Sequence, residues 1–245
     1  NELFNIAKKF DLSFIEHKNY IGGRYSVLSE VGMVPAYLMG VNIHKIRFNF
    51  KKNLIYKKKS FLKDSAIKIS NLMISKKFNN LILLNYVPSL EKFLYWYQQL
   101  IAESLGKKGQ GFLPVVSNAP KDHHSLLQLY LDGPKDKFFY IFSLNQKSKL
   151  KIESRKYLSH HNYIDKKSLS EIKISQKKAV VKSFIKNKIP YREFSIDKCD
   201  EQALGDLFFY FILEVIIIGK ISGLNPFNQP AVEEVKIFTK KILKT

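Results

Sequence analysis

The 245-residue chain is long enough for one large or two small domains, and its composition is that of a globular protein, with 45% hydrophobic, 13% aromatic and 25% charged residues. The 41 Lys and Arg residues against 21 Asp and Glu give a formal net charge of +20, which by itself favours a nucleic acid or an anionic membrane as partner. A single cysteine, Cys199, excludes an internal disulfide framework and a CxxC-type metal site, and fits a reducing compartment.

Lysine supplies most of the positive charge. Proteins that read nucleic acids usually place arginine where a phosphate or a base edge takes two hydrogen bonds. Arginine occurs here at only four positions, namely Arg24, Arg47, Arg155 and Arg192. The lysines are spread over the middle and late chain, which favours a solvated surface and no nucleic-acid partner. Binding of a polyanion is the alternative.

The hydrophobic spacing predicts mainly helices in the first third of the chain. Residues 1–11 have the spacing of a helix, which leads into a short strand over 12–17. A helix over 26–38 follows the glycine pair at 22–23, and another is predicted near 60–77 after a lysine-rich segment.

From residue 79 onward, strands and helices alternate regularly. The predicted strands are 79–87, 112–118 and 137–144, the helices that follow them are 89–105, 123–131 and about 168–187, and then come the segment 190–196 and two closing helices over about 201–218 and 229–243. Apolar strands that alternate with helices of this length predict a parallel sheet with helices on both faces. In such folds, functional sites gather where strands lead into helices.

The most apolar stretch covers residues 203–219. It is short for a membrane span and contains Asp206 and Glu214, which are costly in lipid, so we predict a buried helix. Residues 1–10 are amphipathic and charged, and they lack the apolar core of a secretory leader. We therefore expect a cytoplasmic protein with no membrane association.

Four segments of the chain contain polar residues that the fold alone does not require. The first contains the glycine pair, and the second lies at the end of a predicted helix. In residues 19–29, the glycines allow backbone to approach a ligand and Arg24 follows directly, although a plain turn with Arg24 in a surface ion pair explains the spacing equally well. In residues 97–109, Gln99 and Glu103 lie four apart and share one helix face. Partial burial would suit Glu103 as a general base, and an ordinary exposed helical Glu is the alternative.

The other two segments contain histidines and a late lysine. Asp122 is placed to cap a helix that starts at His123 and His124, where an imidazole can transfer a proton near neutral pH. A capping or surface histidine is an equally good interpretation, and two adjacent histidines without a third ligand make a weak case for zinc. Gln229 and Lys236 flank the first turns of the last helix, where a lone lysine usually faces solvent.

Together these segments resemble one family. GGRYSVLS, QLIAESLGKKG, HSLLQLYLDGP and NPFNQPAVEEVK are similar to signature segments of the glucose-6-phosphate isomerase family, and they occur in that family's order over about residues 19–236. The last segment is the most specific, because it matches the pattern F-[DN]-Q-x-[GA]-V-E-x-x-K. The matching residues are Phe227, Asn228, Gln229, Ala231, Val232, Glu233 and Lys236.

The resemblance implies an enzyme and a reaction. The family interconverts glucose 6-phosphate and fructose 6-phosphate through a cis-enediol intermediate, in glycolysis and gluconeogenesis, and uses no cofactor or metal. Glu103 matches the family's general base, which carries a proton between C2 and C1 of the sugar. Arg24 matches the arginine that stabilises the enediolate.

The resemblance also implies the remaining site residues and a partner. His124 and Lys236 match the pair that opens the sugar ring, and Gln99, Gln229 and Gly23 match positions that line the substrate site. In the family the histidine reaches the site from the neighbouring subunit. A homodimer with shared active sites is therefore implied.

The fold implied by the resemblance has several units. We expect an α/β fold, namely a three-layer αβα sandwich with a mainly parallel sheet of the sugar-isomerase (SIS) type, plus carboxyl-terminal helices. The predicted units are residues 1–20 as the remnant of a first SIS domain, 21–55 as the GGR segment with an inter-domain helix, 56–198 as the second SIS domain and 199–245 as the carboxyl-terminal helices.

Two departures from the family pattern affect the interpretation. Glu30 stands where the family usually has a small residue or proline. The phosphate-binding Ser/Thr loop of the family's first SIS domain has no counterpart here, so we expect a carboxyl-terminal portion of a longer enzyme that is weak or inactive alone. A dual phosphoglucose/phosphomannose isomerase stays open. A non-catalytic SIS sensor is disfavoured, because it would not need Glu103, Arg24 and His124 in family spacing.

Overall fold

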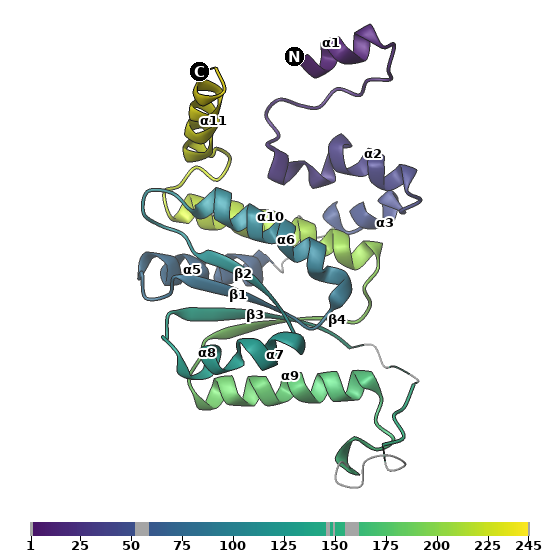
Figure 1. The fold of residues 1–245 in the computed structure, drawn as a ribbon, viewed down its shortest axis with the longest axis vertical. Coiled ribbons are helices and arrows are strands. Elements are labelled where there is room, and N and C mark those ends of the chain that lie inside the picture. Colours follow the sequence, from purple (N-terminus) through teal and green to yellow (C-terminus); the bar gives the residue numbers. More distant parts are fainter. Residues whose placement is uncertain (1, 52–58, 146–147, 149, 155–161, 245) are drawn as a thin grey trace.

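A computed structural model describes residues 2–51, 59–145, 148, 150–154 and 162–244. It shows a mixed α/β fold in which a four-stranded parallel sheet of order β2-β1-β3-β4 is covered by helices on both faces (Figure 1). The predicted fold class is therefore confirmed. Two further helices, at the amino and carboxyl ends of the chain, stand away from these layers at the same end of the molecule.

The described elements alternate along the chain as follows. The strands are β1 (Asn80–Asn85), β2 (Leu113–Asn118), β3 (Lys137–Leu144) and β4 (Tyr191–Ile196). The helices are α1 (Glu2–Lys9), α2 (Glu30–Leu38), α3 (Ile43–Arg47), α5 (Lys59–Ile74), α6 (Glu91–Leu105), α7 (Lys121–Ser125), α8 (Leu127–Asp132), α9 (Leu169–Lys186), α10 (Glu201–Ile221) and α11 (Pro230–Ile242), and short 3-10 turns cover Gly23–Leu28, Pro88–Leu90 and Asn162–Ile164.

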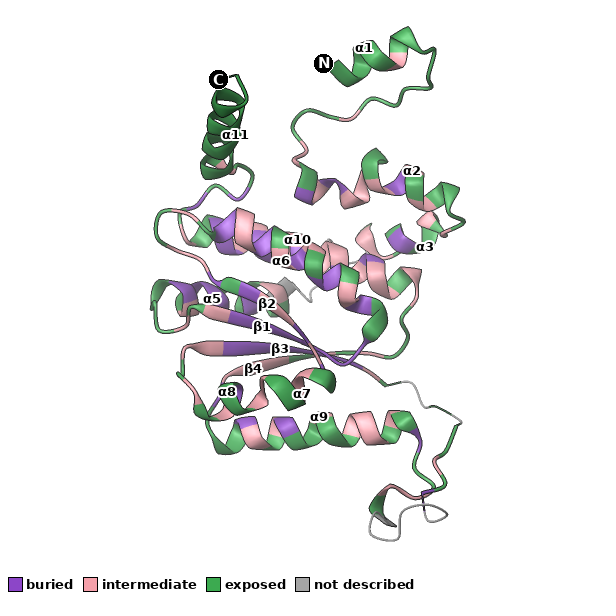
Figure 2. Cartoon of the chain, viewed as in Figure 1, coloured by how far each residue is buried: buried purple, intermediate pink, exposed green. Residues whose placement is uncertain are grey.

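The sheet separates two apolar cores. Side chains alternate along a strand, so Leu81 and Leu83 of β1 pack toward α5, α6 and α10, while Ile82 and Leu84 pack toward α8 and α9. The central strands are therefore buried on both faces (Figure 2), which explains their continuous apolar sequences.

Because the four strands are parallel, all of them begin at one edge of the sheet and end at the opposite edge. Because α6 leads through a short loop into β2, its carboxyl end lies at the edge where the strands begin. Helix α7 directly follows β2 and lies at the opposite edge, where the strands end. From that edge, β1 continues into α6 on one face, while β3 leads toward α9 on the other face.

Most of the predicted elements are confirmed, and the exceptions have local causes. Residues 12–17 form no strand, because the described part of the chain places no strand beside them to share hydrogen bonds. The predicted helix over 26–38 is divided by the extended residue Ser29 into a 3-10 turn and α2. Leu126 likewise divides the predicted helix over 123–131 into α7 and α8. Glu30 begins α2, where a carboxylate in the first turn is favourable.

Helix α10 is the predicted buried helix. Phe211, Val215 and Ile218 are fully buried in it, and Glu214 is buried with both carboxylate oxygens within 3.0 Å of the Arg192 guanidinium. That ion pair explains how a carboxylate is tolerated in this apolar helix. Among the described helices, none has the length and apolar character needed to cross a membrane.

Candidate active site

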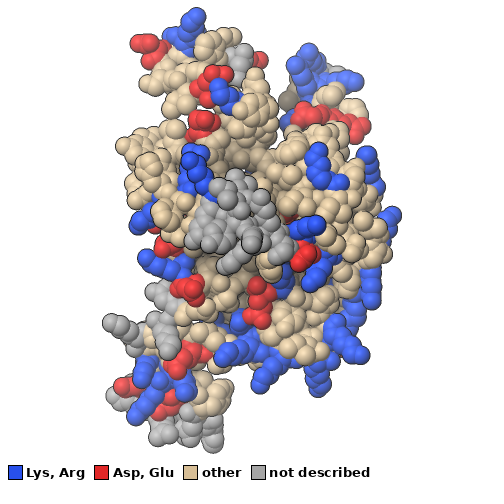
Figure 3. Space-filling model, turned by 180° about the vertical axis from the view of Figure 1, so that it is seen from behind, with Lys and Arg blue, Asp and Glu red and all other residues tan. Residues whose placement is uncertain are grey.

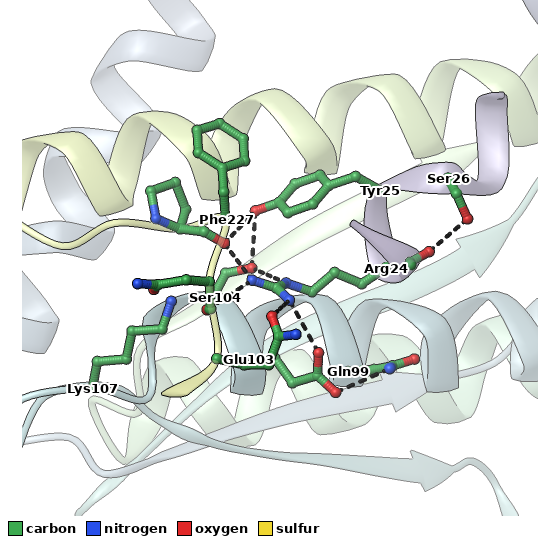
Figure 4. A network of polar contacts seen from close by, with 12 residues as sticks. Arg24, Tyr25, Ser26, Gln99, Glu103, Ser104, Lys107 and Phe227 are labelled. Atoms are coloured by element: carbon green, nitrogen blue, oxygen red, sulfur yellow. Dashed lines mark hydrogen bonds and ion pairs between the residues drawn. The ribbon is translucent and has the colours of Figure 1, made fainter. Parts of the chain in front are cut away.

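Arg24 is the centre of a polar network that joins three distant segments of the chain (Figure 4). Its side chain is buried and lies beside α6, where Nε donates to Ser104 Oγ at 2.9 Å and Nη1 donates to Glu103 Oε2 at 3.1 Å. Nη1 also donates to Gln229 Oε1 at 2.8 Å. The network thus connects the turn after the glycine pair with α6 and with the residue that precedes α11.

Two main-chain carbonyls complete the arginine's hydrogen bonds. Nη2 donates to the carbonyl oxygen of Pro226 at 2.5 Å and to that of Asn228 at 3.1 Å. All five N–H groups of the Arg24 guanidinium are therefore used, which fixes its position and compensates for its burial. Tyr25 supports the same loop, since its hydroxyl donates to the Pro226 carbonyl and lies 2.9 Å from Ser104 Oγ. Burial raises the pKa of the Tyr25 hydroxyl, so it stays a neutral donor.

Glu103 is held from two sides and still reaches solvent. One carboxylate oxygen accepts from Arg24, and the other accepts from Gln99 Nε2 at 3.0 Å, one helical turn away. The Glu103 side chain remains 30% exposed. The prediction that Gln99 and Glu103 share one helix face is confirmed. Glu103 is partly buried, and its two hydrogen bonds fix the orientation of the carboxylate. A carboxylate that is both oriented and accessible can accept a proton from a bound molecule.

Glu103 and Gln229 line a cavity of about 600 Å³ between the end of α6 and the segment 224–232. This volume is typical of a site for a small organic molecule. Lys107 also lines it and donates from Nζ to the carbonyl oxygen of Asn225. Burial, with a further contribution from the nearby Arg24 charge, lowers the pKa of the Lys107 ammonium. Lys107 was not among the residues predicted from the sequence, although it directly follows the glycine that ends α6.

The space beside Gly23 is open. A Cβ atom built at this position would meet no atom of the described residues within 4 Å, and the glycine is exposed at the start of the 3-10 turn that carries Arg24. The predicted role of this glycine in substrate binding therefore stays a prediction.

Lys236 is not brought to the network within this chain. It lies on α11, its side chain is 64% exposed, and its Nζ pairs with Glu233 at 2.7 Å. Helix α11 has no buried residue and projects away from the helix layers (Figure 2). Gln229 joins the site and Lys236 does not, because the chain turns away from the body of the protein at Pro230.

His124 is also remote from Glu103 within one chain. It is exposed on α7, at the edge where the strands end and on the other face of the sheet from α6. Its neighbour His123 is the partnered histidine, with Nε2 2.7 Å from the Tyr86 hydroxyl, and burial lowers the pKa of the His123 imidazole.

The predicted helix cap at Asp122 is wrong in one respect. Helix α7 begins at Lys121, one residue after Pro120, so Asp122 lies in its first turn and does not precede it. The Asp122 carboxylate instead accepts from the Asn118 backbone N–H at 2.7 Å and from Ser117 Oγ at 3.0 Å, and so joins α7 to the end of β2. Within the described ranges, no cluster of three or more His, Cys, Asp or Glu side chains could hold a metal ion.

Curated relatives match nearly the whole chain. It is 34% identical to glucose-6-phosphate isomerase of Methanocaldococcus jannaschii, over 97% of this chain and 60% of the relative, and 34% identical to that of Mycoplasmopsis pulmonis, over 99% and 58%. It is 36% identical to a probable glucose-6-phosphate isomerase of Methanococcus maripaludis, over 95% and 53%. The chain thus spans a little over half the length of these relatives. No protein-family model matches it.

Two solved structures share the fold. A hypothetical protein from Thermus thermophilus superposes with a TM-score of 0.89 at 23% identity, over 99% of this chain and 60% of that one. A glucose-6-phosphate isomerase from Chlamydia trachomatis superposes with a TM-score of 0.74 at 17% identity, over 99% and 56%. At these identities the structures support the fold alone, whereas the sequence matches confirm the resemblance. The chain is a homologue of the glucose-6-phosphate isomerases along a part of their length.

Proposed function

We propose that this chain contributes the catalytic carboxylate of a glucose-6-phosphate isomerase, and that the complete enzyme interconverts glucose 6-phosphate and fructose 6-phosphate. The observation that carries the proposal is the network at the wall of the cavity, in which the buried Arg24 and the exposed Gln99 orient the accessible carboxylate of Glu103. The similarity to curated glucose-6-phosphate isomerases supports a sugar phosphate as the substrate of this general acid–base site.

In the proposed mechanism, Glu103 removes the proton from C2 of the open-chain aldose and returns it to C1. The electrons released from C2 form the C1–C2 double bond of a cis-enediolate, whose negative charge on O1 is stabilised by the nearby guanidinium of Arg24. A proton then passes from the 2-hydroxyl group to O1, which leaves the C2 carbonyl of the ketose once C1 is protonated. Because all five N–H groups of Arg24 are already used within the chain, the arginine acts through its charge and by holding Glu103. Gln99 and Gln229 would present amide groups to the sugar hydroxyls, beside the open backbone of Gly23.

His124 and Lys236 are the proposed pair for ring opening. The family resemblance supports these roles, and a second copy of the chain is needed for His124, because one chain carries it at the sheet edge opposite to Glu103. We therefore also propose a homodimer with composite sites. Lys236 is exposed on α11, so in the complete enzyme its side chain can face a substrate site to which another part of the enzyme contributes.

We further propose that the complete enzyme includes a phosphate-binding portion outside this chain. The exposed apolar side chains of α1 and α11 support this, since such surfaces usually pack against a partner. They include Leu3, Phe4, Ile6, Val235, Phe238 and Ile242. Binding energy from the phosphate supports chemistry at the sugar carbons, so this chain alone should be weak or inactive.

The domain division and the location in the cell are part of the same proposal. Residues 56–198 contain the sheet and correspond to the second SIS domain. Residues 1–20 are the remnant of the first SIS domain, residues 21–55 are the GGR segment with an inter-domain helix, and residues 199–245 are the carboxyl-terminal helices. The boundary at 55–56 falls outside the described residues. Cytoplasmic location accords with a glycolytic enzyme and with a single cysteine, Cys199.

Two alternatives carry less support. Binding to a polyanion rests on the net charge. On the face drawn in Figure 3, acidic side chains lie among the basic ones in the centre and on the left, while basic side chains follow the right and lower right margin. Additional activity on mannose 6-phosphate would depend on how the cavity accommodates the 2-hydroxyl group of the sugar.

Replacement of Glu103 by glutamine tests the proposal in the complete enzyme. The amide has the same shape and keeps a hydrogen bond to Arg24, but it cannot accept the C2 proton, so isomerase activity should fall by about 10²–10⁴-fold. Activity is measured in a coupled assay in both directions, with thermal unfolding as the control for folding. A Glu103→Gln enzyme that retains wild-type turnover would refute the assignment.

A further inference from the structure

A second cavity lies at the edge where the strands end. It has a volume of about 290 Å³ and is enclosed by the residues that follow β1, by the end of β3 and by one face of α9. The lining segments are 86–89, 143–145 and positions 170, 173, 174, 177 and 178. Glu103 lies at the other edge of the sheet and on its other face, so this cavity is separate from the candidate active site.

The position of the cavity coincides with the switch point of the sheet. The chain leaves β1 toward α6 on one face and leaves β3 toward α9 on the other, so the two connections diverge and open a crevice between the strand ends. In open parallel sheets, ligands bind preferentially in such a crevice.

The wall of this cavity is positively charged. Lys173, Lys177 and Lys178 from α9 line it, and none of the described residues that line it is acidic. Lys177 pairs with Glu193 of β4 at 2.6 Å. Lys173 makes a long contact of 3.4 Å from Nζ to the Tyr86 carbonyl oxygen, which leaves donor capacity for a ligand. The chemistry of the wall therefore suits an anion.

A buried hydroxyl group is the second observation. Ser143 is only 6% exposed, and its Oγ has no hydrogen-bond partner among the described residues. Along β3 it continues the series of Phe139 and Ile141, which pack on the α9 side of the sheet, so its side chain points to the face where the cavity lies. Buried hydroxyls normally have a partner, and a ligand oxygen in the cavity would supply one.

We propose that this cavity binds a small phosphate-bearing molecule. Lys173 and Lys178 supply positive charge, and the Ser143 hydroxyl donates to a phosphate oxygen. A tetrahedral phosphate accepts several hydrogen bonds from different directions, which matches lysine and serine donors that converge from a strand end and a helix. The volume suits a phosphate group with a short organic part.

The test measures phosphate binding by isothermal titration at constant ionic strength, with the full chain and with two probes, inorganic phosphate and glycerol 3-phosphate. Lys173→Gln should weaken binding by about tenfold or more, because it removes a charge-assisted contact. Ser143→Ala should also weaken it, and its melting temperature without phosphate should equal or exceed that of the wild type, since no described residue forms a hydrogen bond with the hydroxyl group. Tighter binding of one probe identifies free phosphate or a phosphate ester as the natural form.

Two matched variants distinguish this cavity from the general positive charge of α9 and from the candidate active site. Lys182→Gln removes an exposed lysine further along α9 that does not line the cavity, and Glu103→Gln alters the candidate active site. Both should bind phosphate within about twofold of the wild type. Absence of binding, an equal loss in Lys182→Gln, or loss only in Glu103→Gln would overturn the proposal. Failure of the isomerase assignment would leave these outcomes unchanged, because the binding test does not depend on activity.

Discussion

At the scale of single residues, Arg24 combines charge with a geometry that lysine cannot reproduce. Lysine at this position would keep the charge but offer only three donors from one point. The carbonyl of residue 228 would lose its arginine donor, and that of residue 226 would keep only Tyr25. We expect Arg24→Lys to lower the free energy of unfolding by about 2–4 kcal/mol. It should also reduce isomerase activity, because Glu103 loses its orientation. Denaturant titration and the coupled assay check this, and unchanged values in both would show that charge alone suffices.

The residues of the site were predictable to different degrees. Arg24, Gln99, Glu103 and Gln229 were named from sequence, and the structure brings them together. The carbonyl groups that surround the guanidinium could not be predicted, because a main-chain acceptor leaves no mark in the sequence. Lys107 carried only a weak signal, since lysine is the commonest charged residue in this chain. The distance between His124 and Glu103 could not be predicted, because it depends on how strands and helices far apart in the sequence pack together.

At the scale of elements, α10 shows how one glycine determines helix packing. Alanine usually stabilises a helix relative to glycine by about 1 kcal/mol. At Gly205, however, a Cβ atom would lie 1.9 Å from the Ile46 carbonyl oxygen of α3, which is far inside van der Waals contact. We therefore expect Gly205→Ala to destabilise the protein by about 1–3 kcal/mol. Thermal and denaturant unfolding measure the change, and a gain in stability would contradict the close packing of α3 and α10.

The amino-terminal cap of α10 should make stability depend on pH. The Asp200 carboxylate accepts from the Ala203 backbone N–H at 3.0 Å, and this bond lowers the pKa of Asp200 below its usual value of 3.8. Since the folded-state pKa is depressed, the contribution is complete above about pH 5 and is lost as the pH falls through the folded-state pKa. Asp200→Ala should melt at a lower temperature at pH 7, and its difference from wild type should shrink at pH 3. Asp200→Asn, which still caps a helix, is the control.

At the scale of the whole molecule, periodicity predicted the layers of the fold but not the faces that pack against other parts. The strands of the sheet and the helices α5, α6, α9 and α10 were recognisable, because burial on one or both faces imposes a regular apolar pattern. Residues 12–17 have apolar side chains of the same kind and form no strand. The apolar side chains of residues 12–17 indicate that this segment packs against another surface, and the sequence of the segment does not say which surface that is. The same holds for the exposed apolar face of α11.

The proposed dimer makes a quantitative prediction about mixed subunits. Glu103→Gln and His124→Ala should each inactivate the homodimeric complete enzyme, because each removes one half of every composite site. After the two variants are unfolded together and refolded, half of the dimers are mixed, and each mixed dimer has one site with both defects and one with none. About a quarter of wild-type activity should therefore return. Size-exclusion chromatography controls for equal recovery of dimers. If both residues acted within one chain, mixing would restore no activity, because every site would keep a defect.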